Sequence, residues 1–220
     1  MLSNRAITRV SMEKDLGLNF SDTLDTSSNY KGMTTRANAI LHFLRRQLGA
    51  LTPELFLTIF KSYVRPHLEV FNTVAPPTLK RDSNLLERIQ RTATKSVVGL
   101  RGKTYPERLK HLNLFTLGYR RKRGDLIMTY KIAHQADHAN KSILPATERS
   151  SRGNPFKIAH QRANTTLRSK FFSLRVCALW NALPRHIVIA PSIDSFKRRL
   201  DSYVTSHGLP RTYSGSHQPQ

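Results

Sequence analysis

The chain of 220 residues contains a single cysteine, Cys177. One cysteine cannot form an internal disulfide, and it excludes a cysteine-based zinc site within one chain. This usage is typical of a reduced intracellular compartment, nuclear or cytoplasmic. The sequence also lacks the uncharged apolar run of about 18 residues that spans a membrane, and its start lacks the apolar segment of a signal peptide. We therefore expect a soluble protein with no membrane partner.

Acidic residues are scarce, and none stand in a catalytic pattern. Thirty-six Lys and Arg face fourteen Asp and Glu, a net charge of +22. Nucleotide-transferring polymerases hold two divalent metals between closely spaced carboxylates, such as those of an adjacent aspartate pair. No Asp-Asp occurs here. The sequence predicts no catalytic residue, no metal site and no cofactor in this chain.

Other catalytic motifs are incomplete. The segment 99–104 is similar to a phosphate-binding loop, but Val97 stands where the motif requires glycine, five residues before Gly102. His134 and His138 lie one helical turn apart and could hold a metal, although His134 falls on the apolar face of its predicted helix. A helix-ending turn and a core histidine are the simpler interpretations. No Gly-x-Ser-x-Gly motif suggests a hydrolase.

The positive charge is concentrated in the second half of the chain. Residues 1–100 carry 14 basic and 8 acidic side chains, a net +6, whereas residues 101–220 carry 22 and 6, a net +16. Such a field favours polyanions, and nucleic acid is the commonest one, bound with an affinity that falls steeply with salt. The alternative is a ribosomal-type or merely soluble basic protein.

Apolar periodicity predicts a mainly α-helical bundle with a short N-terminal strand or hairpin and a C-terminal helical module. Leu16, Leu18 and Phe20 alternate as in a strand, whose partner Met1–Val10 can only partly supply. The residues from Ser21 to Asn29 are expected to form a loop.

Four helices are expected in the middle of the chain. The first has Ala37, Ile40, Leu41, Leu44 and Leu48 on one face and stops at Gly49. The second is capped by Thr52, has Phe56, Ile59, Phe60 and Tyr63 inward, ends at Pro66 and pairs antiparallel with the first. The third opens near Asp82 and buries Leu86, Ile89, Ala93 and Val97. The longest runs from Thr116 to Gln135 and buries Tyr119, Leu126, Ile127, Tyr130 and His134.

The carboxyl-terminal part is expected to contain two helices after a linker. Leu167–Leu183 forms one helix in this prediction, and a second, capped by Ser192, buries Phe196 and Leu200. The segment 156–160 alternates as a short strand would. The predicted domains are a strand region (1–25), a helical domain (26–139), a linker with a possible strand (140–164), a helical module (165–206) and a disordered tail (207–220).

Three groups of cations are candidate nucleic-acid contacts. Each group also has another interpretation: a solvated helix face for the first, nuclear-import recognition, also a functional role, for the second, and for the third pairing to Asp194, Asp201 or a backbone carbonyl. Neighbours in the second group point about 100° apart on a helix, so two or three of them reach one phosphate backbone. The groups are Arg81, Arg88, Arg91 and Lys95; Arg120, Arg121, Lys122 and Arg123; and Arg168 and Arg175.

Six segments, taken in their order along the chain, resemble those of a known protein family. They are Lys14-Asp15-Leu16-Gly17-Leu18, Val64-Arg65-Pro66-His67-Leu68-Glu69, Leu86–Lys95, Leu100–Leu109, Asn164–Pro184 and Ala190–Asp201. Over roughly residues 10 to 206 the chain resembles the carboxyl-terminal region of jockey-like non-LTR retrotransposon reverse transcriptases. One departure is that Val74 is followed directly by Ala75-Pro76, where that family has a tryptophan before the small residue and proline.

The resemblance implies a thumb-like role for Ala37–Val98 beside a duplex, and contact of the later half with element RNA in target-primed reverse transcription. The implied partners are template RNA, an RNA–DNA duplex, and a palm domain in a longer product. The catalytic aspartates and their magnesium would belong to that palm, upstream of the Lys14–Leu18 strand. Two alternatives remain open: a helical module that binds a protein through apolar faces, and a non-functional remnant that does not fold alone.

Overall fold

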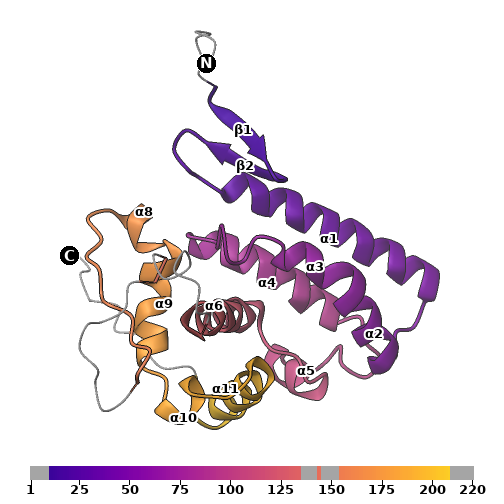
Figure 1. Ribbon diagram of the computed structural model, residues 1–220. Coiled ribbons are helices and arrows are strands. Elements are labelled where there is room, and N and C mark those ends of the chain that lie inside the picture. Colours follow the sequence, from indigo (N-terminus) through magenta and orange to yellow (C-terminus); the bar gives the residue numbers. More distant parts are fainter. Residues whose placement is uncertain (1–9, 135–142, 145–153, 209–220) are drawn as a thin grey trace, which may run out of the picture. The chain divides into compact units, whose positions relative to one another are not determined.

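The computed structural model describes residues 10–134, 143–144 and 154–208 (Figure 1). The chain divides into two compact units, Met1–Arg120 and Arg121–Gln220, and each is described by itself. The fold is mainly helical with an N-terminal two-stranded hairpin, which confirms the predicted fold class. Among the described residues, no helix is both long and apolar enough to cross a membrane.

The first unit opens with an antiparallel hairpin of β1 (Met12–Asp15) and β2 (Leu18–Ser21). Leu16 and Gly17 form its turn with φ of 47° and 84°, the left-handed region that a tight two-residue hairpin turn requires. The expected strand therefore starts after Gly17, and its partner is the segment just before the turn. Leu16 is exposed, whereas Leu18 is buried.

Helix α1 (Ser27–Leu48) begins before the predicted loop ends and stops at Gly49, as expected. Two side chains explain the early start. The Asp25 carboxylate accepts the Ser27 N–H at 3.0 Å, which satisfies a free donor at the helix start. Asn29 accepts the Asn19 N–H and donates to the Asn19 carbonyl, both at 2.8 Å. These bonds tie the first turn of α1 to β2.

The second predicted helix does not end at Pro66. Helix α2 (Pro53–Ile59) begins at Thr52, whose hydroxyl accepts the Leu55 N–H. It continues through a π-helical segment, η1 (Phe60–Val64), into α3 (Arg65–Glu69). The Arg65 N–H reaches five residues back to the Phe60 carbonyl. This wider turn makes room for a proline ring, which has no N–H and clashes with the carbonyl four residues earlier.

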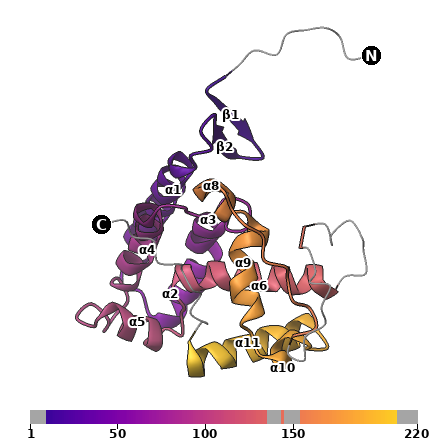
Figure 2. The same ribbon diagram turned by 90° about the vertical axis from the view of Figure 1, so that its left-hand side faces the viewer.

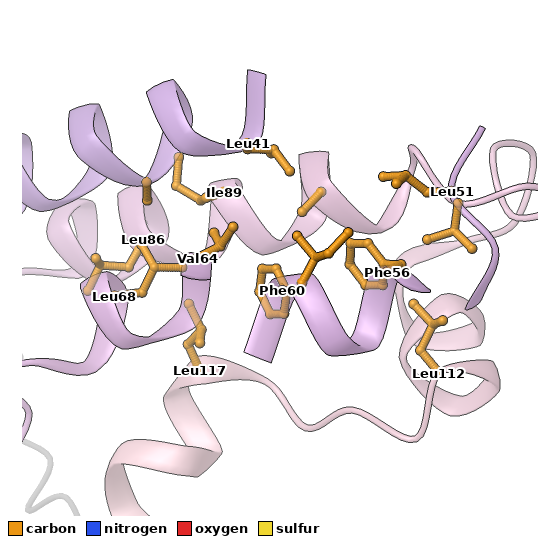
Figure 3. Packing of buried hydrophobic residues seen from close by; sticks show 14 of the residues in the cluster. Leu41, Leu51, Phe56, Phe60, Val64, Leu68, Leu86, Ile89, Leu112 and Leu117 are labelled. Carbon is orange, nitrogen blue, oxygen red and sulfur yellow. The ribbon is translucent and has the colours of Figure 1, made fainter. Parts of the chain in front are cut away.

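Helix α4 (Lys80–Thr94) buries Leu86, Ile89 and Ala93, and Val97 is buried just beyond it, all as predicted. It packs along α1, and Figure 3 shows its leucine and isoleucine facing the side chains of α2, η1 and α3. The core of the first unit consists of Tyr30, Met33, Ala37, Leu41, Leu51, Phe56, Ile59, Phe60, Val64, Leu68, Leu86, Ile89, Ala93, Val97, Leu100, Leu112 and Leu117.

Two further helices follow. Helix α5 (Tyr105–His111) was not predicted, although a capping box marks its start: the Glu107 carboxylate accepts the Thr104 N–H and hydroxyl, both at 2.7 Å. Helix α6 (Leu117–His134) begins in the first unit and continues into the second. Within the described residues its 18 residues make it shorter than α1 with 22, whereas the sequence analysis expected it to be the longest helix.

In the second unit, the predicted helix Leu167–Leu183 is broken. The structure has α8 (Thr166–Ser169) and α9 (Phe172–Asn181), because Phe171 takes an extended conformation, with ψ of 148°, and begins the second helix. Helices α10 (Arg185–Val188) and α11 (Ile193–His207) follow (Figure 2). The Ser192 hydroxyl caps α11 by accepting the Ser195 N–H, as predicted.

No strand forms in 156–160, whose described residues lie against α9 instead. The Trp180 indole N–H donates to the Phe156 carbonyl at 2.7 Å, and the Asn181 amide bonds both the N–H and the carbonyl of Ile158 at 3.0 and 2.8 Å. The core of the second unit consists of Leu126, Tyr130, Ile132, Leu144, Ile158, Val176, Cys177, Leu179, Trp180, Leu183, Ile187, Val188, Ala190, Phe196 and Leu200.

The division between the two units falls inside α6, whereas the sequence analysis placed a boundary at 139/140. The first core ends at Leu117 and the second begins at Leu126, on the same helix. Much of the predicted linker (140–164) and of the tail (207–220) lies outside the described residues.

Candidate nucleic-acid interface

The first group of predicted cations forms one surface. Arg81, Arg88, Arg91 and Lys95 are all exposed on α4 or at its end, opposite its buried face. At 1.5 Å of rise per residue, the row is about 21 Å long. We call these four side chains the α4 basic stripe.

Of the two acids on α4, Asp82 and Glu87, Glu87 is turned away from this stripe. Its carboxylate instead accepts the Tyr105 hydroxyl and, at 3.0 Å, the Leu117 N–H. Burial, followed by the hydrogen bond to Glu87, raises the pKa of Tyr105 well above its ordinary value. Glu87 therefore serves the packing of α4 against the segments that follow it.

Most of the stripe is not neutralised within the described part of the chain. There, no carboxylate lies within ion-pair distance of Arg88, Arg91 or Lys95. Arg81 differs, because its guanidinium bonds the Ser27 hydroxyl at 3.3 Å and lies 3.7 Å from Asp82. Arg91 lies over the Tyr105 ring, 4.8 Å from its centroid, which fixes the cation in place.

One side of α4 borders a hollow of about 560 Å³ that brings in cations from elsewhere in the sequence. Lys95 lines it together with Arg45 from the last turn of α1 and Arg101 from the turn after α4. Thr92 and Ser96 add hydroxyl groups to the same hollow. These three cations and two hydroxyl groups are of the kinds that bind phosphate oxygens in protein complexes with nucleic acids.

A second hollow, of about 400 Å³, lies further along the groove between α1 and α4. Arg88 and Thr92 line it from α4, and Asn38 and His42 line it from α1. Because Thr92 belongs to both hollows, the two form one continuous strip. We call it the α1–α4 basic surface; its cationic members are Arg45, Arg88, Lys95 and Arg101, with His42 beside them.

Sequence reasoning missed Arg45 and Arg101. Arg45 lies 50 residues before Lys95, and only the packing of α1 on α4 brings them together. A periodic signal existed, because Asn38, His42 and Arg45 share one face of α1 at spacings of four and three. Arg101 belongs to the 99–104 segment, which follows the end of α4 at Thr94 and where Gly99 takes a φ of 75° in the turn that the sequence predicted.

The second predicted group, Arg120 to Arg123, is divided between two ion pairs. Arg120 forms a two-point ion pair with Glu69, and Arg123 does the same with Asp201 at 2.6 and 2.7 Å. Arg121 is half-buried, and only Lys122 of the four is fully exposed. Arg120 and Arg123 therefore each stabilise the unit to which they belong by pairing with a carboxylate.

Glu69 serves two arginines. Besides Arg120, Arg65 lies 3.9 Å from its carboxylate. Burial, and then the neighbouring Arg120 cation, lower the pKa of Arg65 below its ordinary value, whereas Glu69 acts in the opposite direction. This cluster neutralises little of the total charge but fixes α3 to the start of α6.

The third predicted group separates into one structural and one exposed arginine. Arg175 forms a two-point ion pair with Asp125, at 2.9 and 2.8 Å, and also donates to the Lys170 carbonyl at 3.1 Å. Carboxylate pairing was the predicted alternative for it, but Asp125 was not among the expected partners. Arg168 is exposed, lies 4.8 Å from the centroid of the Phe171 ring and donates to Gln161 at 3.4 Å.

The histidine that sequence analysis considered for a metal has another role. The His134 ring stacks on the Tyr130 ring with centroids 4.0 Å apart and is tilted against the Phe156 ring at 4.3 Å. His138 lies outside the described residues. Among the residues that the structure describes, no three His, Cys, Asp or Glu side chains gather as a metal site would require.

No protein-family model, curated protein or solved structure matches this chain.

Proposed function

We propose that this chain is a non-catalytic, nucleic-acid-binding portion of a non-LTR retrotransposon reverse transcriptase, which holds template RNA or the primer duplex inside the cell. The order of the six sequence segments supports the family assignment. The α1–α4 basic surface supports the binding role. Magnesium and nucleotide chemistry would belong to a palm domain, to which this chain would be the thumb-like and carboxyl-terminal partner.

One observation carries the proposal: cations from α1, α4 and the following turn share a surface that described carboxylates leave unneutralised. Like charges placed side by side repel each other, and a phosphate backbone relieves that repulsion. Arg and Lys contacts of this kind go to phosphates and position a strand without reading its sequence. Recognition through the backbone and shape therefore fits template or duplex binding better than a sequence-specific role.

The test is the salt dependence of binding to an RNA hairpin and an RNA–DNA duplex, measured by fluorescence anisotropy. Arg88→Glu/Lys95→Glu reverses two cations on the surface. Because each lost phosphate contact removes about 0.7–0.9 from the slope of log affinity against log salt, we expect a slope smaller by about 1.4–1.8 and much weaker binding at low salt.

The matched control is Lys14→Glu/Lys110→Glu, which changes the net charge equally at exposed positions on β1 and α5. It should retain most of the parent affinity. Equal losses in both variants would mean that only total charge matters, and the α1–α4 assignment would be wrong. Binding of a protein ligand, with no salt-dependent RNA binding, would favour the interaction-module alternative instead.

A further inference from the structure

Another hollow on the first unit, separate from the α1–α4 basic surface, is lined by aromatic rings rather than by cations. It occupies about 650 Å³ on the other side of α1 from the basic surface, where α1 packs against η1 and α3. Its rings are Phe43 from α1 and Tyr63 from η1, which are 62% and 59% exposed. The remaining lining comes from Ala39, Ile40, Leu44, Ser62 and His67.

The π-helical segment accounts for the exposed tyrosine. Apolar periodicity predicts that Tyr63 faces the core together with Phe56, Ile59 and Phe60. The wider turn of η1 changes the spacing after Phe60, so that Val64 is buried and Tyr63 faces the hollow. Burying an aromatic side chain contributes roughly 1.5–3 kcal/mol, so two large rings left exposed in one hollow forgo a substantial stabilisation. A ligand that covers both rings would recover it.

The charge around this hollow favours an anionic ligand. None of its lining residues is acidic, and α1 contains no acidic residue along its whole length. Arg36 and Arg46 are exposed on α1, seven residues before and three residues after Phe43, the spacings that place side chains on one side of a helix. The nearest acid on α3 is Glu69, which is engaged by two arginines.

Exposed rings flanked by arginines match single-stranded nucleic acid. Unpaired bases stack on aromatic side chains, and cations beside them contact the backbone. The Ser62 hydroxyl and the His67 imidazole add polar groups that suit the edge of a base. A duplex keeps its bases stacked inside and cannot use these rings. An apolar protein partner would not require the arginines.

We propose that the hollow formed by Phe43, Tyr63 and His67 is a stacking site for an unpaired nucleobase of a single strand. The inference rests on the proposed function only in taking nucleic acid as the ligand, because it concerns a different surface. His42 and Phe43 are consecutive residues of α1 that line the two different hollows. A strand crossing α1 would thus place phosphates on one side and a base on the other.

The experiment compares two strands of equal length and charge: oligouridylate and the same backbone without bases. With the full chain, we expect oligouridylate to bind about tenfold more tightly, since stacking contributes roughly that factor or more per base. Phe43→Ala/Tyr63→Ala should remove this ratio and leave the affinity for the abasic strand unchanged. Leu55→Ala/Val74→Ala, which trims two exposed apolar residues outside the hollow, should preserve it.

A second readout does not depend on affinity. In Phe43→Trp, an indole enters the hollow, while Trp180, the only native tryptophan, stays buried and gives a constant background. Oligouridylate should quench the new fluorescence, and the abasic strand should not. Equal quenching by both strands, or equal affinity of the parent for both, would overturn the stacking site.

The outcomes also separate the two proposals. Arg88→Glu/Lys95→Glu should weaken the binding of both strands equally and preserve the ratio of their affinities. If that variant binds normally while the ratio persists, the basic surface is misassigned and the stacking site stands. If Phe43→Ala/Tyr63→Ala alters only self-association in sedimentation, the hollow belongs to a contact between copies of this chain, and the stacking proposal fails.

Discussion

At the scale of single residues, the arginines of this chain serve two distinct purposes. Arg120, Arg123 and Arg175 each form a two-point ion pair with a carboxylate far away in the sequence. Arg88, by contrast, lines an exposed hollow. The planar guanidinium suits both tasks, because it grips a carboxylate or a phosphate with the same two parallel donors. Residue type alone therefore does not distinguish a structural arginine from a binding one.

The Arg175–Asp125 pair is the most buried of the ion pairs between different helices, with side chains 15% and 10% exposed. We expect Asp125→Ala to destabilise the second unit by about 3–5 kcal/mol, because it leaves a guanidinium without its carboxylate in a poorly hydrated site. Urea unfolding followed by Trp180 fluorescence measures the change. The double variant Asp125→Leu/Arg175→Met, which removes both charges, should recover most of the loss. A single variant as stable as the parent would show that the pair is dispensable.

At the scale of elements, helix α4 both packs into the core and carries an exposed row of cations. Its inner face supplies Leu86, Ile89 and Ala93 to the core, and its outer face carries the basic stripe. Glu87 and Gln90 face the segments after α4: Gln90 donates to the Tyr105 hydroxyl at 3.0 Å and to the Phe115 carbonyl at 2.9 Å. Because Glu87 bonds these segments and the buried Asp82 accepts the Ser27 hydroxyl, the helix presents mainly cations outward.

Helix α5 provides a pH-dependent test at this scale. Hydrogen bonds from the Thr104 hydroxyl and N–H lower the pKa of Glu107 below its ordinary value of about 4.5. A carboxyl with a lowered folded-state pKa contributes stability that is present above its unfolded pKa and is lost as the pH falls through the folded pKa. Glu107→Gln should therefore reduce the stability at neutral pH and flatten its decline below about pH 4.5. Thermal unfolding across pH 2–7 measures this, on the order of a few degrees at most.

Glu13→Gln is the matched control, since it removes one exposed carboxylate from β1 without touching a helix end. If both variants change the pH profile alike, the effect comes from net charge and the capping box of α5 contributes nothing specific.

At the scale of the whole molecule, two separate cores occur along one chain. The first is built from helices α1 to α4 with η1, residues of the connecting segments and the start of α6, and the second mainly from the rest of α6 and helices α9 to α11. The only tryptophan, Trp180, lies in the second core. Its fluorescence thus reports the second unit, whereas far-ultraviolet circular dichroism reports both.

We expect the two cores to respond separately to mutation. Phe196→Ala should lower the stability seen by Trp180 fluorescence by about 3–5 kcal/mol, because it empties the centre of the second core. Leu86→Ala should cost about 2–5 kcal/mol in the first unit, seen by circular dichroism, and leave the Trp180 midpoint unchanged. If Leu86→Ala shifts the Trp180 transition equally, the chain unfolds as one cooperative body.

Sequence patterns were sufficient to predict the helices whose signals are local. The buried face of α4, the stop of α1 at Gly49 and the caps of α2 and α11 at Thr52 and Ser192 were all predicted. These features depend on side-chain periodicity and on hydrogen bonds within one turn, which neighbouring residues fix. The exposed α4 basic stripe follows from the same periodicity.

Only the tertiary structure decided which distant side chains meet. The partners Arg123 and Asp201 lie 78 residues apart, and Arg175 and Asp125 lie 50 apart. The meeting of Arg45 with Lys95 and the outward turn of Tyr63 depend on the packing of α1 and on the π-helical segment η1. The physical reason is range: helix periodicity acts over a few residues, whereas ion pairs and surface hollows depend on where packed helices bring their faces together.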